Sequence, residues 1–206
     1  MSSQLERYLR EQSSQIITGM ELSVALQKSE DALFGQIKRA VKNDLLIRVR
    51  RGLFCLGGYL VKEKINTFVL AAYIYGPSYV SFESALSYYG LIPEAVYTMT
   101  SATTSRSKDF LTPVGKFSYT HMPEKHFFCE VERVALLEKS FFIASPWRAL
   151  CDYVYAYKRN WISIEPLIES LRIDVDELPL LDEKIASTLS NYYNNKRVDL
   201  FLKGVQ

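Results

Sequence analysis

The chain has 206 residues, of which 48% are hydrophobic and 23% charged, and its formal net charge is +2. This composition is typical of a globular protein and excludes a wholly disordered one. The longest apolar run, FVLAAYIY at 68–75, is too short to cross a bilayer, and the charged first residues do not resemble a signal peptide. Three widely spaced cysteines without a CxxC pair are typical of reduced thiols. We therefore expect a soluble, cytoplasmic protein with no membrane partner.

Charge is distributed unevenly along the chain. Residues 1–64 contain eleven Lys or Arg and seven Asp or Glu, a net charge of +4, which leaves −2 for residues 65–206. Segment 165–183 has seven acidic residues against Arg172 alone. A basic front on a slightly acidic body indicates a polyanionic partner for the N-terminal part. Two ordinary solvated surfaces would give the same counts.

The first sixty residues predict three short helices and then a β-hairpin. Helical spacing of apolar residues predicts the first helix over 3–12. Thr18 and Glu21 have the spacing of a capping box, which predicts the start of a second helix. Ser29 is a good N-cap for a third helix, which ends at Asn43.

The third helix is predicted to have one apolar and one polar face. The polar face carries Asp31, Gly35, Lys38, Arg39 and Lys42. Gly35 is unusual there, because glycine inside a helix costs about 1 kcal/mol relative to alanine. Close approach of the helix to a bulky ligand would explain this glycine, and so would a tolerated surface position.

Residues 45–59, LLIRVRRGLFCLGGY, predict the hairpin, because apolar residues alternate with arginines and a glycine stands at the bend. Three helices followed by a hairpin is the order of a winged helix-turn-helix, whose third helix enters the major groove of DNA. The hairpin tip then lies over the phosphates, which attract cations regardless of base sequence. We therefore expect DNA-binding residues on both elements: Gly35, Lys38, Arg39, Lys42, Arg48, Arg50 and Arg51. The alternative is a winged helix that contacts protein.

Residues 62–206 predict a second domain after the winged helix-turn-helix domain of residues 1–61, so that the whole chain is of the α+β class. The expected elements are helices at 64–75 and after Ser81, a strand at 97–104, a hairpin over 110–122, strands at 127–134 and 141–144, and a helix that begins at Ser145 and Pro146. Two or three further helices follow. This order predicts a small, mostly antiparallel sheet with C-terminal helices, packed against the first domain.

The sequence contains little that indicates catalysis. His121 and His126 lack metal-binding spacing, and Glu130 and Glu132 fit the solvent face of a strand. P-loop, dinucleotide-binding and nucleophile-elbow motifs are absent, as is the Glu-x-Lys tripeptide of one nuclease class. We expect no enzyme activity, no metal and no cofactor.

Four stretches have a familiar form. They are RVRRGLF at 48–54, YVSFESALSYYGLIP at 79–93, TPVGKFSY at 112–119 and SPWRALCDY at 145–153. Together they resemble the AbiEi family, the antitoxins and transcriptional regulators of bacterial type IV toxin–antitoxin systems that act in abortive infection.

The resemblance implies a winged helix that binds promoter DNA and represses its own operon. It also implies a C-terminal domain that counters a nucleotidyltransferase-like toxin without forming a stable complex with it. Two alternatives stay open. One is a DNA-targeted nuclease or transferase that uses the second domain, and the other is a plain winged-helix repressor with no toxin.

Overall fold

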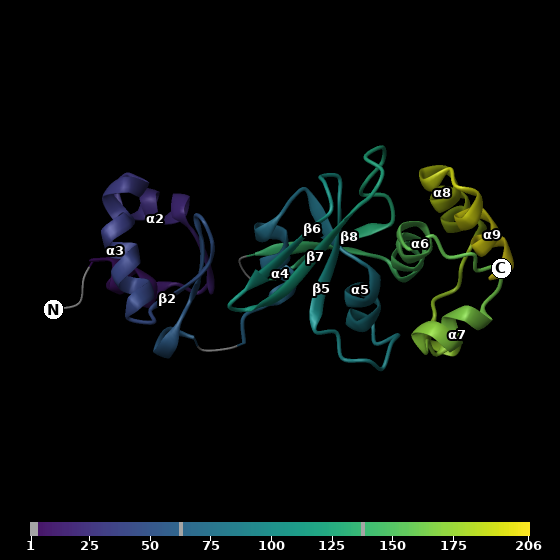
Figure 1. The fold of residues 1–206 in the computed structure, drawn as a ribbon, viewed down its shortest axis with the longest axis horizontal. Coiled ribbons are helices and arrows are strands. Elements are labelled where there is room, and N and C mark those ends of the chain that lie inside the picture. The colour runs from purple at the N-terminus through teal and green to yellow at the C-terminus, as the bar shows by residue number, and fades with distance from the viewer. Residues whose placement is uncertain (1–3, 62–63, 137–138) are drawn as a thin grey trace.

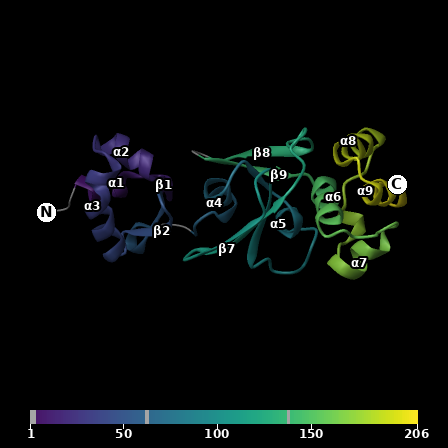
Figure 2. The same ribbon diagram turned by 45° about the horizontal axis from the view of Figure 1, so that its top comes forward.

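The computed structural model describes residues 4–61, 64–136 and 139–206 and has a mixed α+β fold. Figures 1 and 2 show an elongated molecule, with the N-terminal residues at one end, a sheet in the middle and a group of helices at the other end. We call residues 4–61 the N-terminal unit and residues 64–206 the C-terminal unit. Within the described residues, no helix is both long and apolar enough to span a bilayer.

The N-terminal unit consists of three helices and a three-stranded antiparallel sheet. Its elements are α1 (Gln4–Glu11), β1 (Ile16–Thr18), α2 (Gly19–Leu26), α3 (Glu30–Lys42), β2 (Leu46–Arg50) and β3 (Leu53–Leu56), and the sheet order is β1-β3-β2. Thr18 and Glu21 form the predicted capping box of α2, and Ser29 caps α3 through the backbone N–H of Ala32. The predicted helices and hairpin are therefore confirmed, and β1 is a strand that the sequence did not predict.

Strands β1 and β3 of this sheet pack against different apolar clusters on their two faces. Ile17, Phe54 and Leu56 belong to the apolar cluster of α1, α2 and α3. Alternate residues of the same strands, Ile16, Leu53 and Cys55, belong instead to the main core of the C-terminal unit. Period-two alternation in strands whose two faces are both covered explains why all of β3 is apolar.

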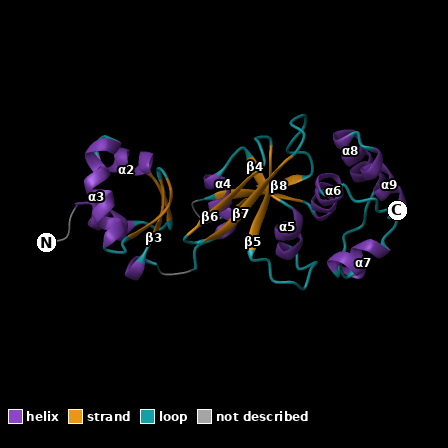
Figure 3. Ribbon diagram, in the orientation of Figure 1, coloured by secondary structure: helices purple, strands orange, loops and turns teal. Residues whose placement is uncertain are grey.

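The C-terminal unit contains a six-stranded sheet and most of the helices. Its elements are α4 (Thr67–Ile74), β4 (Ser78–Val80), α5 (Phe82–Tyr88), β5 (Thr98–Thr103), β6 (Lys108–Thr112), β7 (Gly115–His121), β8 (Val131–Ala135), β9 (Ser140–Ala144), α6 (Pro146–Ala156), α7 (Glu165–Leu171), α8 (Glu183–Tyr193) and α9 (Lys196–Gly204). In Figure 3, α4 lies on the side of the sheet nearer the N-terminal unit, while α6 lies toward the C-terminal helices.

The large sheet is mixed, with strand order β6-β7-β5-β4-β9-β8. The β4–β9 and β5–β7 pairs are parallel, and the other three are antiparallel. The expected sheet is therefore mostly antiparallel, as predicted, but it has six strands and includes two parallel pairs that the sequence did not predict. Alternation of apolar residues predicts a strand but not its partner, and β4 pairs with a strand about sixty residues away.

The two units are in direct contact. The Lys139 ammonium donates to the Glu21 carboxylate at 2.8 Å and lies 5.0 Å from the centre of the Tyr73 ring. The Arg50 guanidinium donates to the backbone carbonyl of Ile74 at the end of α4. The two stretches of chain therefore pack against each other, as expected. The predicted domain boundary falls between residues 61 and 62, and residues 62–63 lie outside the described residues.

Candidate nucleic-acid interface

A groove of about 480 Å³ lies between α3 and the β2–β3 hairpin. Its cationic side chains are Lys38 from the helix and Arg48 and Arg51 from the hairpin. Its other lining residues are Gly19, Asp31, Phe34, Ile37, Val41, Gly52 and Phe54. The fold therefore brings together three of the seven predicted DNA-binding residues around one concave surface.

Helix α3 presents its polar face to solvent because its other face is held by the core. Leu33 and Ala40 are buried, whereas Gly35, Lys38 and Lys42 are exposed. Apart from its chain neighbours and the nearby backbone of α3, a Cβ atom added to Gly35 would meet no atom within 4 Å. No packing within the described residues therefore requires glycine at this position, and the space beside it is open.

Arg39 lies on a different side of α3 from Lys38. Its Nε atom donates to the Gly35 carbonyl at 3.3 Å. It also lines a second groove, of about 310 Å³, together with Leu5 and Glu6 of α1. A ligand in the groove beside the hairpin would therefore lie nearer to Lys38 than to Arg39.

The three arginines of the hairpin also differ. Arg48, Arg50 and Arg51 are all exposed, and the β2–β3 register shifts between Arg48 and Arg50. Gly52 has a φ of 71°, a backbone conformation that glycine adopts without strain and that forms the tight bend. Arg48 and Arg51 line the groove, but the side chain of Arg50 contacts Ile74 of the C-terminal unit. Arg50 therefore has a structural partner that the sequence did not predict.

Phe34 is a groove residue that the sequence reasoning missed. Its side chain lies on α3 one turn before Lys38 and is 63% exposed. The signal was present in the sequence, because Phe34 is a large aromatic residue outside the apolar face formed by Leu33, Ile37 and Ala40. Phe34 lines the groove together with the apolar residues Ile37 and Val41, and an apolar patch rimmed by polar residues is a candidate for contact with a ligand.

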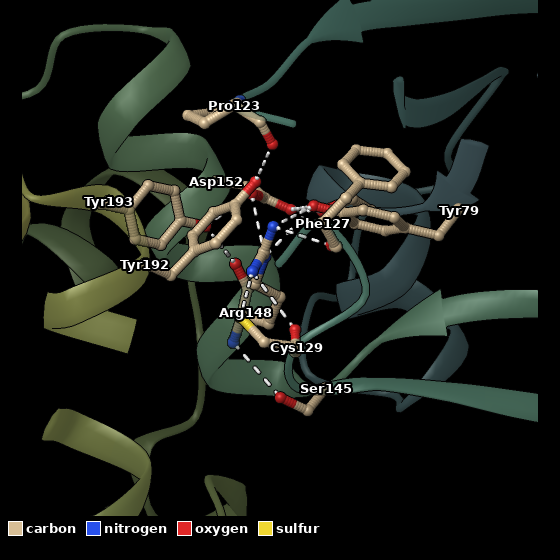
Figure 4. Close-up of polar contacts among 10 residues, drawn as sticks. Tyr79, Pro123, Phe127, Cys129, Ser145, Arg148, Asp152, Tyr192 and Tyr193 are labelled. Atoms are coloured by element: carbon tan, nitrogen blue, oxygen red, sulfur yellow. Dashed lines mark hydrogen bonds and ion pairs between the residues drawn. The ribbon is translucent and has the colours of Figure 1, made fainter. Parts of the chain in front are cut away.

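The C-terminal unit contains a buried polar cluster around an ion pair (Figure 4). Arg148 and Asp152 are one helical turn apart on α6, both are 0% exposed, and their Nε and Oδ1 atoms are 3.2 Å apart. The hydroxyl groups of Tyr79, Ser81 and Tyr193 donate to Asp152 at 2.9, 2.6 and 2.5 Å. These contacts join α6 to β4, to the segment after it and to α8.

Aromatic rings and carbonyl groups complete the surroundings of Arg148. Its guanidinium carbon lies 3.7 Å from the centre of the Tyr192 ring, and its Nη atoms donate to the carbonyls of Phe127 and Cys129. Burial lowers the pKa of Arg148, but the Asp152 carboxylate and the surrounding tyrosine hydroxyls together outweigh burial, so the pKa is raised. Burial also raises the pKa of the Tyr79 and Tyr193 hydroxyls. At neutral pH the cluster therefore contains a charged arginine and neutral tyrosines, and its interactions connect elements of the fold.

The two histidines considered for catalysis lie on the surface. His121 and His126 are exposed, and the His121 ring nitrogen Nδ1 lies 3.0 Å from the carbonyl of Ser105. Within the part of the chain that the structure describes, no group of three or more His, Cys, Asp or Glu side chains is placed to hold a metal ion. Glu132 belongs to the edge strand β8 and is exposed, as predicted.

The groove between α3 and the hairpin is thus the strongest candidate site in the chain, and its ligand is inferred from the residues around it. The sequence predicts Lys38, Arg48 and Arg51 as binding residues, and the structure brings these three together in the groove. Comparison with known proteins gives no further assignment, because no protein-family model and no curated protein matches the chain.

Proposed function

We propose that the N-terminal unit is a winged helix-turn-helix that binds double-stranded promoter DNA. The element order and the sheet order β1-β3-β2 support this proposal, with α3 as the recognition helix and the β2–β3 hairpin as the wing. The single observation that carries the proposal is the groove, in which Lys38 of the helix and Arg48 and Arg51 of the hairpin surround a concave surface.

The chemistry of this surface fits DNA in two ways. Arginine and lysine attract phosphates through charge, which gives affinity without base specificity. A helix face with exposed side chains can then read base edges in the major groove. We place Gly35, Lys38, Lys42, Arg48 and Arg51 at the proposed interface. Arg39 lies toward α1, and Arg50 is engaged by the C-terminal unit.

The proposal is tested by fluorescence anisotropy with DNA from upstream of the protein's own gene and with a scrambled duplex. We expect tighter binding to the upstream DNA and an affinity that falls steeply with salt. Lys38→Ala is expected to weaken binding, whereas Lys116→Ala, a matched change at an exposed lysine on β7, is expected to have little effect. Equal weakening by both variants, or binding that is insensitive to salt, would contradict the proposal.

We further propose that the protein is the antitoxin and autoregulatory repressor of a type IV abortive-infection operon. The support is the resemblance of its four sequence stretches to the AbiEi family, which extends over both units. The C-terminal unit would counter a nucleotidyltransferase-like toxin without a stable complex. Expression of the adjacent gene alone is expected to stop growth, and co-expression of this protein to restore it. If expression of the adjacent gene does not affect growth, the protein would instead be a repressor without a toxin.

A further inference from the structure

Phe34 is a large apolar side chain that is exposed within a cationic groove. A buried role is excluded by its 63% exposure. The ring lines the groove together with Lys38, Arg48 and Arg51. A ligand in this groove would therefore contact the ring directly.

The position of Phe34 along α3 also matters. It is the fifth residue of α3, in the N-terminal half of the helix. In helix-turn-helix proteins, this half of the recognition helix contacts base edges, while the surrounding cations hold the backbone. Phe34 lies on the groove side with Lys38, and the phosphate-attracting Arg48 and Arg51 lie across the groove.

The base chemistry that suits an apolar ring in the major groove is the methyl group of thymine. The major-groove edges of the other three bases carry hydrogen-bonding groups without a methyl group, and a phenyl ring cannot satisfy those groups. We propose that Phe34 determines sequence specificity by contacting the 5-methyl group of a thymine. This inference rests on the proposed DNA-binding function, and it names the base that the site selects.

The spacing of Phe34 and Lys38 along α3 determines how far the thymine lies from the base that Lys38 contacts. Four residues of helix rise correspond to about 6 Å, or roughly two base-pair steps. A lysine in the major groove pairs best with the O6 and N7 atoms of guanine. The selected thymine therefore lies within about two base pairs of a guanine contacted by Lys38.

The experiment uses the full-length protein and the duplex that its footprint defines upstream of its gene. Each thymine is replaced singly by deoxyuridine, which removes the methyl group and leaves every hydrogen-bonding atom in place. For the wild-type protein, we expect one such replacement in each bound site to weaken binding about fourfold, the value of one buried methyl group. Phe34→Ala is expected to bind more weakly and to lose all sensitivity to that replacement, because the two changes remove the same contact.

Tyr97→Ala is the matched control, since Tyr97 is an aromatic residue of the C-terminal unit that is 89% exposed. This variant is expected to keep both the wild-type affinity and the sensitivity to deoxyuridine. Circular dichroism of Phe34→Ala is expected to match the wild type, because the side chain is mostly outside the core.

Three other outcomes would overturn the inference, and they are distinguishable. If Phe34→Ala keeps the deoxyuridine sensitivity of the wild type, Phe34 does not read thymine, while the proposed DNA binding stands. If Phe34→Ala binds DNA normally but fails to rescue cells from the toxin, the ring contacts a protein instead. If the wild-type protein binds no duplex at all, the proposed function itself is wrong.

Discussion

Three arginines within four residues of the β2–β3 hairpin have two different environments. Arg48 and Arg51 line the groove beside α3, whereas the Arg50 guanidinium contacts the carbonyl of Ile74. Regular alternation would place Arg48 and Arg50 on the same side of β2, but the register of β2 against β3 shifts between them. Arginines that are close together in the sequence therefore do not all face the same surface.

We expect Arg48→Ala combined with Arg51→Ala to weaken binding to all DNA sequences. Each lost phosphate contact should lower the slope of log affinity against log salt by about 0.9. Arg50→Ala serves as the control, and it should leave that slope unchanged because its side chain is turned toward the C-terminal unit. Titrations at several salt concentrations give the slopes, and an unchanged slope in the double variant would show that the hairpin does not contact the backbone.

Gly35→Leu tests how closely α3 approaches DNA. Leucine favours a helix more than glycine does, and a Cβ at this position meets no atom outside its own stretch of α3 within 4 Å, so the folded protein should be at least as stable. Inserting a bulky side chain into a packed interface costs about 1–3 kcal/mol, so the affinity for the promoter should fall roughly ten- to a hundredfold. Gly35→Ala should have a smaller effect. Wild-type affinity in the leucine variant would place this face of α3 away from DNA.

At the scale of elements, the helix N-caps could be predicted from the sequence, but the pairing of strands and the packing between elements could not. Thr18, Ser29 and Ser145 begin helices as the sequence indicates, because a cap depends on residues only a few positions away. The expected strand at 127–134 begins only at Val131, and its pairing with β9 places it at a sheet edge. The Arg148–Asp152 cluster draws on β4 and α8, about seventy residues before and forty after it, so no local pattern could reveal it.

One sign of this cluster was nevertheless visible. Arg148 and Asp152 are four residues apart in the sequence. Their neighbours in this segment, Trp147, Leu150, Cys151 and Val154, are all buried. Opposite charges at this spacing usually form a surface pair on a helix. In a helix with most sides covered, they instead form a buried pair.

We expect Asp152→Asn to destabilise the C-terminal unit strongly. The variant leaves the Arg148 cation buried without its counter-charge, a change that typically costs about 3–5 kcal/mol. Asp176→Asn, at an exposed aspartate, should change stability by less than about 0.5 kcal/mol. Urea unfolding followed through Trp147 and Trp161, the two tryptophans of the chain, reports on this unit. A loss below about 1 kcal/mol would mean that the pair contributes little.

At the scale of the whole molecule, the two units share a core but expose different surfaces. The basic groove belongs to the N-terminal unit, while segment 165–183, with its seven acidic residues, lies in the C-terminal unit. Changes on one exposed surface should therefore leave the other surface intact. This separation of surfaces allows the two proposed activities to be tested independently.

We expect neutral glutamine at Lys38, Arg39 and Lys42 to abolish repression of the operon but not rescue from the toxin. All three side chains are exposed, so the variant should fold normally. The test measures growth of cells that express the neighbouring toxin together with this variant from an inducible promoter, and a promoter fusion measures repression. Loss of rescue at normal protein levels would show that α3 also serves in neutralisation.

The three-stranded sheet of the N-terminal unit lies between the two apolar clusters of the molecule. Ile16, Leu53 and Cys55 pack into the same cluster as Leu70 and Ile74 of α4. Cleavage of the chain between the units would uncover this apolar sheet face, and exposed surfaces of this kind lead to aggregation. If both proposed activities are correct, a single proteolytic event would then end both of them together. The two proposed activities would therefore have one common lifetime in the cell, set by the stability of the intact chain.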